Sequence, residues 1–354
     1  MKKLLNVALV GCGRISKRHA ELLGKNQITG MRLIAVCDLL KSKAKKIASE
    51  FTIPYYTDMH KMMHEQTVDV VVVLTESGNH SENVIALAPY GAHIIVEKPM
   101  ALRVIDADQM IKACAAQNIN LFVVKQNRFN VPVVKLREAI ESKRLGKIVM
   151  GTVRVRWCRE QSYYDQDSWR GTWLMDGGVL TNQASHHIDL LEWMIGDIDT
   201  VYAKSTTALV NIEAEDSAVV IVKFKNGALG IIEATTAVRP KDLEGSLSLI
   251  GEKGSVEISG FAVNELRHWN FIDPEPSDLL VKEKFSVNPP SVYGFGHKAY
   301  YDHVVDVINN KSKALVDGVE GRKSLAVISA IYEAIETNKE VHVNYKNLSR
   351  LGSK

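Results

Sequence analysis

The chain has 354 residues, of which 46% are hydrophobic and 24% charged, as is typical of a globular protein with room for two domains. Its net charge of +3 is too small to indicate a nucleic acid or a membrane surface as partner. No segment approaches the ~18 consecutive apolar residues of a membrane span.

The first predicted elements are a strand over residues 6–10, a glycine turn, and a helix that begins near Ser16. Gly11 can adopt the positive φ that a sharp strand-to-helix turn needs, and Gly13 leaves the backbone amides accessible to a pyrophosphate. The helix N-terminus adds free N–H groups and the positive end of its dipole. The spacing predicts a dinucleotide-binding turn in which Ser16 occupies the third small position.

A second predicted strand, over residues 32–38, ends on Asp38, at about the 20-residue distance that a dinucleotide fold requires. A carboxylate at this place accepts hydrogen bonds from the adenosine ribose and repels a 2′-phosphate. Leu39 and Leu40 follow it, and no arginine does, so the sequence favours NAD over NADP.

Strand and helix patterns alternate up to residue 125. They predict helices over residues 41–51, 81–90 and 105–117, and strands over residues 68–75, 93–97 and 120–124. Such β–α units form a doubly wound parallel sheet that binds ligands beyond the carboxyl ends of its strands. The glycine turn, the loop after Thr75 and residues 97–99 should therefore converge on one crevice. We expect residues 1–125 to be an NAD-binding Rossmann domain.

From residue 126 the pattern changes to an α+β domain. It predicts helices over residues 131–142, 182–195, 300–309 and 321–338, and strands over residues 148–158, 201–208, 217–225, 228–235, 245–250 and 254–259. Short strands joined by tight turns indicate an open, mainly antiparallel sheet. One face of such a sheet needs a cover, so we expect residues 126–354 to bind substrate and to form a homodimer or homotetramer. The last helices could pack back on the first domain.

The cysteines, Cys12, Cys37, Cys114 and Cys158, have no metal-ligand spacing, which is typical of a reduced cytoplasmic protein. The start, MKKLLNVALVGC, has the features of a lipoprotein signal. Cleavage at Cys12 would remove the strand that the glycine turn needs, so we predict a cytoplasmic protein.

Lys98 follows a predicted parallel strand and precedes Pro99. The proline restricts Lys98 to an extended backbone or permits a cis bond that turns its ammonium group into the crevice. A partly desolvated lysine near a nicotinamide would have a lowered pKa and could exchange a proton with a substrate hydroxyl. An ordinary surface lysine is the alternative, and the position at the end of the strand favours the functional role.

Two adjacent histidines form the second candidate, and they point about 100° apart on a helix. His187 lies on an apolar stripe that is typical of a core face, whereas His186 shares the adjoining face with Asn182 and Asp189. An imidazole beside the reacting hydroxyl can act as acid or base at neutral pH. Either histidine taken alone is more often structural, and neighbouring histidines have the wrong helical spacing for a metal site.

Basic and aromatic residues form a third group. It comprises Gln126, Asn127, Arg128, Asn130, Arg154, Arg156, Arg159, Trp169, Arg170 and Trp173. Arginine binds phosphate and carboxylate oxygens bidentately, and aromatic faces stack on a base or a sugar. For Arg154 and Arg156, a solvated strand face is an equally good interpretation.

The chain resembles the glucose-fructose oxidoreductase / inositol dehydrogenase / MocA family along nearly its whole length. The segments that carry the resemblance are VALVGCGRIS with VCD, VEKPMA, KQNRFN and GGVLTNQASHHIDLLEWMIGD. VVKQNRFNVPV, YYDQDSWRGTW and NQASHHIDLLEWM are similar to the group of this family, WlbA/WbpB, that oxidises UDP-N-acetyl-glucosaminuronic acid at C3′.

The resemblance implies that Lys98 and His186 are the catalytic pair. The family usually has an aspartate four residues before the catalytic histidine, and this position, Asn182 here, selects His186 over His187. Glu76 is a second departure, since many members have proline there. Expected cofactor contacts are Gly11, Gly13, Arg14, Ile15, Asp38, Thr75, His80, Glu97, Lys98 and Gln126. Expected substrate contacts are Lys98, Asn127, Arg128, Arg156, Trp169, Arg170, Asn182, His186 and His187.

We therefore expect a dehydrogenase that transfers a hydride from C3′ of a UDP-linked N-acetylated glucuronic acid to NAD, in the synthesis of bacterial surface polysaccharide. The reduced cofactor would be reoxidised by exchange or by 2-oxoglutarate. One alternative is an inositol dehydrogenase-like enzyme that acts on a free polyol or sugar. Another is a non-catalytic sugar-sensing regulator, against which the retention of Lys98 and His186 argues.

Overall fold

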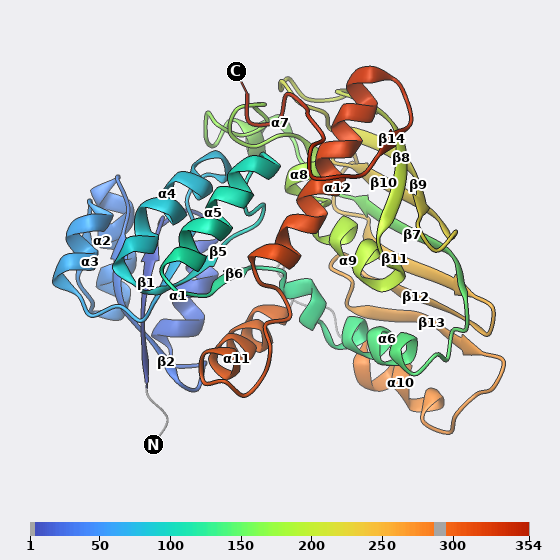
Figure 1. Cartoon of the computed structure of the whole chain (residues 1–354), viewed down its shortest axis with the longest axis horizontal. Coiled ribbons are helices and arrows are strands. Elements are labelled where there is room, and N and C mark those ends of the chain that lie inside the picture. Colours follow the sequence, from blue (N-terminus) through green and yellow to red (C-terminus); the bar gives the residue numbers. More distant parts are fainter. Residues whose placement is uncertain (1–3, 287–294, 354) are drawn as a thin grey trace. The chain divides into compact units, whose positions relative to one another are not determined.

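The computed structural model describes residues 4–286 and 295–353, without the side chains of residues 282–284, and divides into two compact units (Figure 1). The first unit consists of the chain up to Val124 together with Lys298–Arg322, and the second of Lys125–His297 together with the chain from Lys323. Residues 1–3, part of the expected first domain, lie outside the described residues.

The first unit contains a six-stranded sheet of order β3-β2-β1-β4-β5-β6 in which every neighbouring pair is parallel. Its strands are β1 (Leu5–Val10), β2 (Met31–Cys37), β3 (Tyr55–Tyr56), β4 (Val70–Val73), β5 (His93–Val96) and β6 (Leu121–Val123). Its helices are α1 (Ser16–Gly24), α2 (Lys41–Phe51), α3 (Met59–Glu65), α4 (His80–Leu87) and α5 (Val104–Ala116), with 3₁₀ turns at Ser77–Asn79 and Ala88–Tyr90. Most of α11 (Gly296–Ile308) also belongs to this unit. The expected doubly wound sheet is confirmed.

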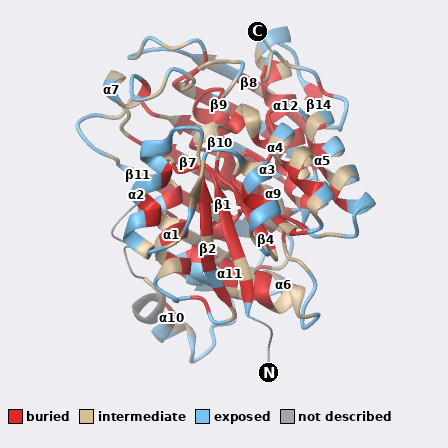
Figure 2. Ribbon diagram, turned by 90° about the vertical axis from the view of Figure 1, so that its left-hand side faces the viewer, coloured by how far each residue is buried: buried red, intermediate tan, exposed pale blue. Residues whose placement is uncertain are grey.

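The apolar run that predicted a parallel strand is buried on both faces. All four valines of β4 are fully buried, and Figure 2 shows β1, β2 and β4 as buried ribbons. The strand order reverses between β1, which pairs with β2, and β4, which pairs with β5. In open α/β sheets this reversal opens a crevice at the carboxyl ends of the strands, where the glycine turn follows β1.

The second unit contains an eight-stranded sheet of order β13-β12-β11-β7-β10-β9-β8-β14. Its strands are β7 (Ile148–Arg156), β8 (Ile198–Thr206), β9 (Ser217–Phe224), β10 (Leu229–Thr235), β11 (Glu244–Gly251), β12 (Gly254–Ser259), β13 (Glu265–Phe271) and β14 (Val341–His342). The expected mainly antiparallel sheet is confirmed, but it is not a simple meander. β7 lies between β10 and β11 and pairs with β10 in parallel.

The helical segments of the second unit are a 3₁₀ turn at Gln126–Phe129, α6 (Val131–Glu141), α7 (Gln161–Tyr164), α8 (Val179–Asn182), α9 (Ser185–Ile195), α10 (Asp278–Phe285) and most of α12 (Gly318–Thr337). The helix predicted over residues 182–195 corresponds to α9, which begins three residues later, and Asn182 is the last residue of the separate helix α8. The N–H of Ala184 bonds to the carbonyl oxygen of Val179 at 2.8 Å, a five-residue step that interrupts the helix between α8 and α9.

Helix α9 packs on the sheet across β7 and β11. Gly151 permits this close approach, because a Cβ there would lie 2.3 Å from Ile195 Cδ1. Side chains alternate along a strand, so the residues of β7 with even numbers point to the face opposite α9. Within the described residues, no helix is both long and apolar enough to cross a bilayer.

Candidate active-site residues

The glycine turn of the first unit has the geometry that a dinucleotide pyrophosphate needs. Gly11 has a φ of +99°, and a Cβ there would lie 2.6 Å from the Leu74 carbonyl group. At Gly13, by contrast, a Cβ would meet no atom within 4 Å, so the backbone borders open space. The Ser16 hydroxyl donates to the Gly13 carbonyl oxygen at 2.6 Å. The residues of this turn fit a bound dinucleotide.

Asp38 is held against this turn by the backbone. Its Oδ2 accepts a hydrogen bond from the Cys12 N–H at 2.7 Å, and its Oδ1 accepts one from the Leu40 N–H at 2.8 Å. Burial, followed by the charge of Asp38, raises the pKa of the Cys12 thiol to about 12. The thiol therefore stays protonated and adds no negative charge beside the place expected for the phosphates.

Two predicted cofactor residues, His80 and Glu97, are buried beside Lys98 in the same unit. The ring of His80 contacts the carbonyl oxygens of Thr75 and Pro99. Glu97 Oε2 accepts a hydrogen bond from the Lys98 N–H at 2.9 Å, and the Lys98–Pro99 peptide bond is cis. The loop after β4 and the turn after β5 are thus connected around Lys98, as the convergence of strand ends predicts.

The second unit distinguishes the two adjacent histidines of α9. His187 is 0% exposed, its ring packs edge-on against Trp157 with centroids 6.0 Å apart, and burial lowers its pKa to about 4. His186 is 7% exposed, and its Nε2 lies 3.1 Å from Nε2 of Gln126. His187 is therefore surrounded by core, whereas His186 is held by a side chain that the sequence had associated with the site.

A buried ion cluster lies next to this pair in the second unit. The Arg128 guanidinium donates to both carboxylate oxygens of Asp189, at 2.8 and 2.9 Å, and lies over the Trp193 ring. Lys125 Nζ lies 3.5 Å from Asp189 Oδ1 and donates to Ser324 Oγ at 2.7 Å. Burial alone would raise the pKa of Asp189, but Arg128 and Lys125 bring it below its usual range. Asn127 is buried on the same 3₁₀ turn as Gln126 and Arg128.

Asn182 shows why an amide suits the position where the family usually has aspartate. Its Nδ2 donates to Asp176 Oδ1 at 2.6 Å, and Asp176 Oδ2 accepts the Gly171 N–H at 2.8 Å. An aspartate at position 182 would place a second carboxylate against the buried Asp176, which is costly. The amide replaces this repulsion by a hydrogen bond.

The remaining predicted substrate residues lie in other parts of the second unit. Arg156 points to the sheet face opposite α9, where Glu233 binds it through two hydrogen bonds of 2.7 Å and Glu244 lies 3.1 Å away. Arg170 pairs with Asp167 at 3.0 Å and lies over the Trp169 ring. The structure brings His186 and Gln126 together, but it does not bring Arg156 to them.

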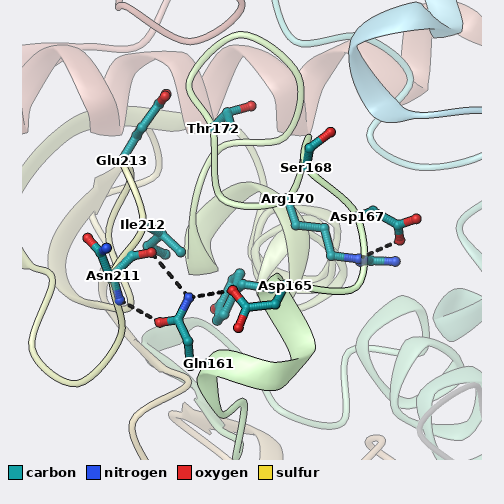
Figure 3. A pocket seen from close by; sticks show the side chains of 10 residues that line it. Gln161, Asp165, Asp167, Ser168, Arg170, Thr172, Asn211, Ile212 and Glu213 are labelled. Carbon is teal, nitrogen blue, oxygen red and sulfur yellow. Dashed lines mark hydrogen bonds and ion pairs between the residues drawn. The ribbon is translucent and has the colours of Figure 1, made fainter.

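Arg170 lines a cavity of about 240 Å³, and Figure 3 shows its guanidinium beside Asp167. The lining residues are Gln161, Tyr164, Asp165, Asp167, Ser168, Arg170, Thr172, Asn211, Ile212 and Glu213. Three carboxylates outnumber the one guanidinium, which argues against a diphosphate here. The amides and hydroxyls would suit a polyhydroxyl group.

Three buried polar residues of the second unit, Asp176, Glu215 and Tyr332, were not predicted from the sequence. Glu215 Oε1 accepts hydrogen bonds from the Leu180 N–H and the Tyr332 hydroxyl, both at 3.0 Å, and burial raises its pKa to about 7. Together with Asp176, Glu215 and Tyr332 support the segment that leads to Asn182. The two glycines after Asp176 indicate a special backbone there and could have drawn attention to Asp176. Glu215 and Tyr332 are distant in sequence, and no local pattern indicates their role.

The parallel sheet, the open glycine turn and Asp38 define the class of protein, an oxidoreductase with an NAD-binding Rossmann domain. Two family models support this: "Oxidoreductase family, NAD-binding Rossmann fold" matches residues 5–125, and "Oxidoreductase family, C-terminal alpha/beta domain" matches residues 137–343. The chain belongs to the Gfo/Idh/MocA family, as its motifs indicated. The expected cofactor, NAD, is confirmed with the family.

The chain is similar to two solved WlbA dehydrogenases, each in complex with NADH and UDP-GlcNAcA. The one from Bordetella pertussis is 39% identical, with a TM-score of 0.93 over 97% of this chain and 99% of that chain. The one from Chromobacterium violaceum is 40% identical, with a TM-score of 0.90 over 97% of each chain. The myo-inositol 2-dehydrogenase of Thermotoga maritima is 27% identical over 351 residues, which cover 95% of this chain and 98% of that protein. The chain thus has the fold of NAD-binding sugar dehydrogenases.

Proposed function

We propose that this protein oxidises C3′ of a UDP-linked N-acetylated glucuronic acid to the 3-keto sugar, with NAD as hydride acceptor. The observation that carries the proposal is the 39–40% identity, over 97% of the chain, to two dehydrogenases in complex with NADH and UDP-GlcNAcA. The presence of Lys98 and His186 supports an enzyme over a sugar-sensing regulator.

In the proposed mechanism, His186 is the base that takes the proton of the C3′ hydroxyl, and Lys98 polarises this oxygen or relays the proton. The Gln126 amide fixes the His186 ring, while the fully buried His187 serves packing. The Gly11–Gly13 turn and Asp38 would hold NAD, which supplies the hydride acceptor when bound. Trp169 and Arg170 are proposed to contact the sugar part of the nucleotide-sugar, because the carboxylates around Arg170 argue against its diphosphate. Arg156, which Glu233 and Glu244 bind, has a weaker case as a substrate contact.

The 3-keto product has the carbonyl group that an aminotransferase needs, so we place the reaction before a transamination in the synthesis of bacterial surface polysaccharide. A cytoplasmic location suits this role. Reoxidation of NADH by 2-oxoglutarate, or by exchange with free NAD, completes the cycle.

The substrate proposal predicts NAD reduction with UDP-GlcNAcA and much slower reduction with myo-inositol, measured as the rise in NADH absorbance. UDP-GlcNAc, which lacks the carboxylate, is the matched control, because it tests whether the uronic acid group is recognised. A parallel reaction with 2-oxoglutarate shows whether bound NADH is reoxidised in place. Turnover with the free polyol alone would instead favour the inositol dehydrogenase alternative, which the Thermotoga relative supports.

A second copy of this chain is proposed to cover the open face of the eight-stranded sheet. Exposed apolar side chains gather there across neighbouring strands: Met150, Val219, Ile221, Leu229, Ile231 and Ile250. Register sets Ile231 beside Ile221 and Leu229 beside Met150. An exposed apolar surface of this kind is typical of a protein–protein interface. The acidic and basic side chains around Arg156 can pair with the corresponding groups of a second copy of the chain.

We therefore expect a dimer or a tetramer in light scattering, and a smaller species for Ile221→Lys. Ile221 is 59% exposed, so the substitution should leave the fold of the single chain intact. Leu348→Lys is the control, since Leu348 is exposed outside this sheet. A monomeric wild-type protein would contradict the proposal.

A further inference from the structure

Two buried histidines of the first unit contact the turn that carries Lys98, and neither is explained by the proposed chemistry. His80 begins α4 and is buried, with Nδ1 2.7 Å from the Pro99 carbonyl oxygen and Nε2 3.0 Å from the Thr75 carbonyl oxygen. One ring therefore joins the loop after β4 to the turn after β5.

His19 reaches the same turn from α1. Its Nε2 lies 3.1 Å from Glu97 Oε1, and its Nδ1 lies 2.6 Å from the Tyr301 hydroxyl of α11. The other oxygen of the Glu97 carboxylate accepts the Lys98 N–H at 2.9 Å. The Tyr301 hydroxyl can donate to Nδ1 while Nε2 donates to the Glu97 carboxylate. Tyr301, His19 and Glu97 thus form a continuous chain that ends on the Lys98 backbone.

The contacts of His80 depend on its protonation. Both partners are carbonyl oxygens, so both contacts are hydrogen bonds only while the ring carries two protons. Burial lowers the pKa of His80, and the two carbonyls and the carboxylates of Glu97 and Glu76 oppose this. The connection between loop and turn is therefore complete in the protonated state and one hydrogen bond weaker in the neutral state.

We propose that His19 and His80 are positioning residues for Lys98, which hold the 97–99 turn from the α1 side and from the α4 side. The inference rests on the proposed function, because it assumes that Lys98 must be placed accurately for proton transfer. Neither histidine contacts the reacting atoms in this account. A displacement of about 1 Å at a catalytic group can cost roughly 100-fold in rate, so loss of either contact should be measurable.

The test compares His19→Leu and His80→Leu with the conservative His80→Gln and with Tyr301→Phe. We expect the leucine variants to lower kcat by roughly 10- to 100-fold with little change in the KM for the sugar. His19→Leu should also leave NADH binding unchanged, whereas His80 is itself an expected cofactor contact. Tyr301→Phe should give a smaller loss, and His80→Gln should recover part of kcat because its amide still donates. The ratio of wild-type to His80→Gln kcat should rise as the pH falls, since only the wild type gains a second hydrogen bond.

His60→Gln is the matched control. His60 of α3 also contacts a tyrosine, with Nδ1 2.8 Å from the Tyr90 hydroxyl, but on the surface of the same unit. Its kcat should equal that of the wild type. Circular dichroism follows folding and fluorescence follows NADH binding, so that a misfolded variant is recognised. If a leucine variant misfolds, the kcat values of Tyr301→Phe and His80→Gln test the positioning role.

Unchanged kcat in folded leucine variants would overturn the inference. If Lys98→Met also retains full turnover, the role given to Lys98 has failed instead. Crystal structures of the leucine variants separate the two cases without any substrate: displacement of the 97–99 turn supports the positioning role, and an unmoved turn refutes it.

Discussion

Replacing Lys98 by methionine is expected to lower kcat with the UDP-linked uronic acid by roughly 100- to 10,000-fold, the range of general acid–base catalysis. Methionine keeps the unbranched apolar stem but has no ammonium group to polarise or relay the C3′ hydroxyl proton. The cis bond and the Glu97 contact involve the backbone of residue 98, which the substitution leaves in place. Stopped-flow measurement of NADH formation gives the rate of the first turnover.

Lys98→Arg separates charge from proton exchange. An arginine keeps the positive charge but does not deprotonate, so partial activity of Lys98→Arg would assign a polarising role to Lys98, and its inactivity a proton relay. NADH fluorescence titration measures any change in cofactor affinity, since Lys98 is also an expected cofactor contact. Full turnover by folded Lys98→Met would exclude Lys98 from the chemistry.

The first unit was largely predictable because its signals are local. The valine run of β4 reads as a strand buried on both faces, and the helix predicted over residues 41–51 has the bounds of α2. The glycine turn was recognisable from its local spacing, although the close contact that excludes a side chain at Gly11 is with Leu74, 63 residues away. The elements of this unit that were not predicted are short. Strand β3 has two residues and helix α3 has seven, which are too few to show a periodic pattern.

The second unit was less predictable because long-range pairing decides its sheet. The position of β7 between β10 and β11 depends on partners some 75 to 100 residues away, which no local pattern encodes. β13 was missed for a related reason: ELRHWNF mixes polar and aromatic residues and gains its strand form by pairing with β12. The helix predicted over residues 182–195 began three residues too early, because apolar spacing does not show the Ala184 hydrogen bond that separates α8 from α9.

For the candidate residues of α9, the spacing predicted a core face but not the partners of the side chains. The apolar stripe placed His187 on the core face, and this is where the structure has it. The partners of Asn182 and Asp189 could not be read from the sequence. Asp176 comes from the preceding loop, and Arg128 lies 61 residues before Asp189. For Arg156, whose alternative was a solvated strand face, the partners Glu233 and Glu244 were not predicted either.

The buried ion cluster of the second unit gives the largest expected effect on stability. Asp189→Asn leaves Arg128 and Lys125 buried without their counter-charge, and we expect the free energy of unfolding to fall by about 3–5 kcal/mol. Burial already lowers the pKa of Lys125, and loss of Asp189 removes the main group that opposes this. In the variant, the pKa of Lys125 is lower in the folded chain than in the unfolded chain. Between these two pKa values the unfolded chain binds more protons, so the loss of stability should diminish as the pH rises. Urea unfolding at several pH values measures both effects.

An apolar replacement of the whole cluster distinguishes stability from function. The triple variant Lys125→Met, Arg128→Met and Asp189→Leu removes all three charges at similar volume, and it should recover most of the unfolding free energy. Its kcat should nevertheless stay low, because the Arg128–Asp189 pair fixes the 3₁₀ turn whose Gln126 contacts His186. Recovery of both stability and kcat would show that the charges serve folding alone. If Asp189→Asn unfolds like the wild type at every pH, Asp189 does not stabilise the buried charges of Arg128 and Lys125 as its distances to them indicate.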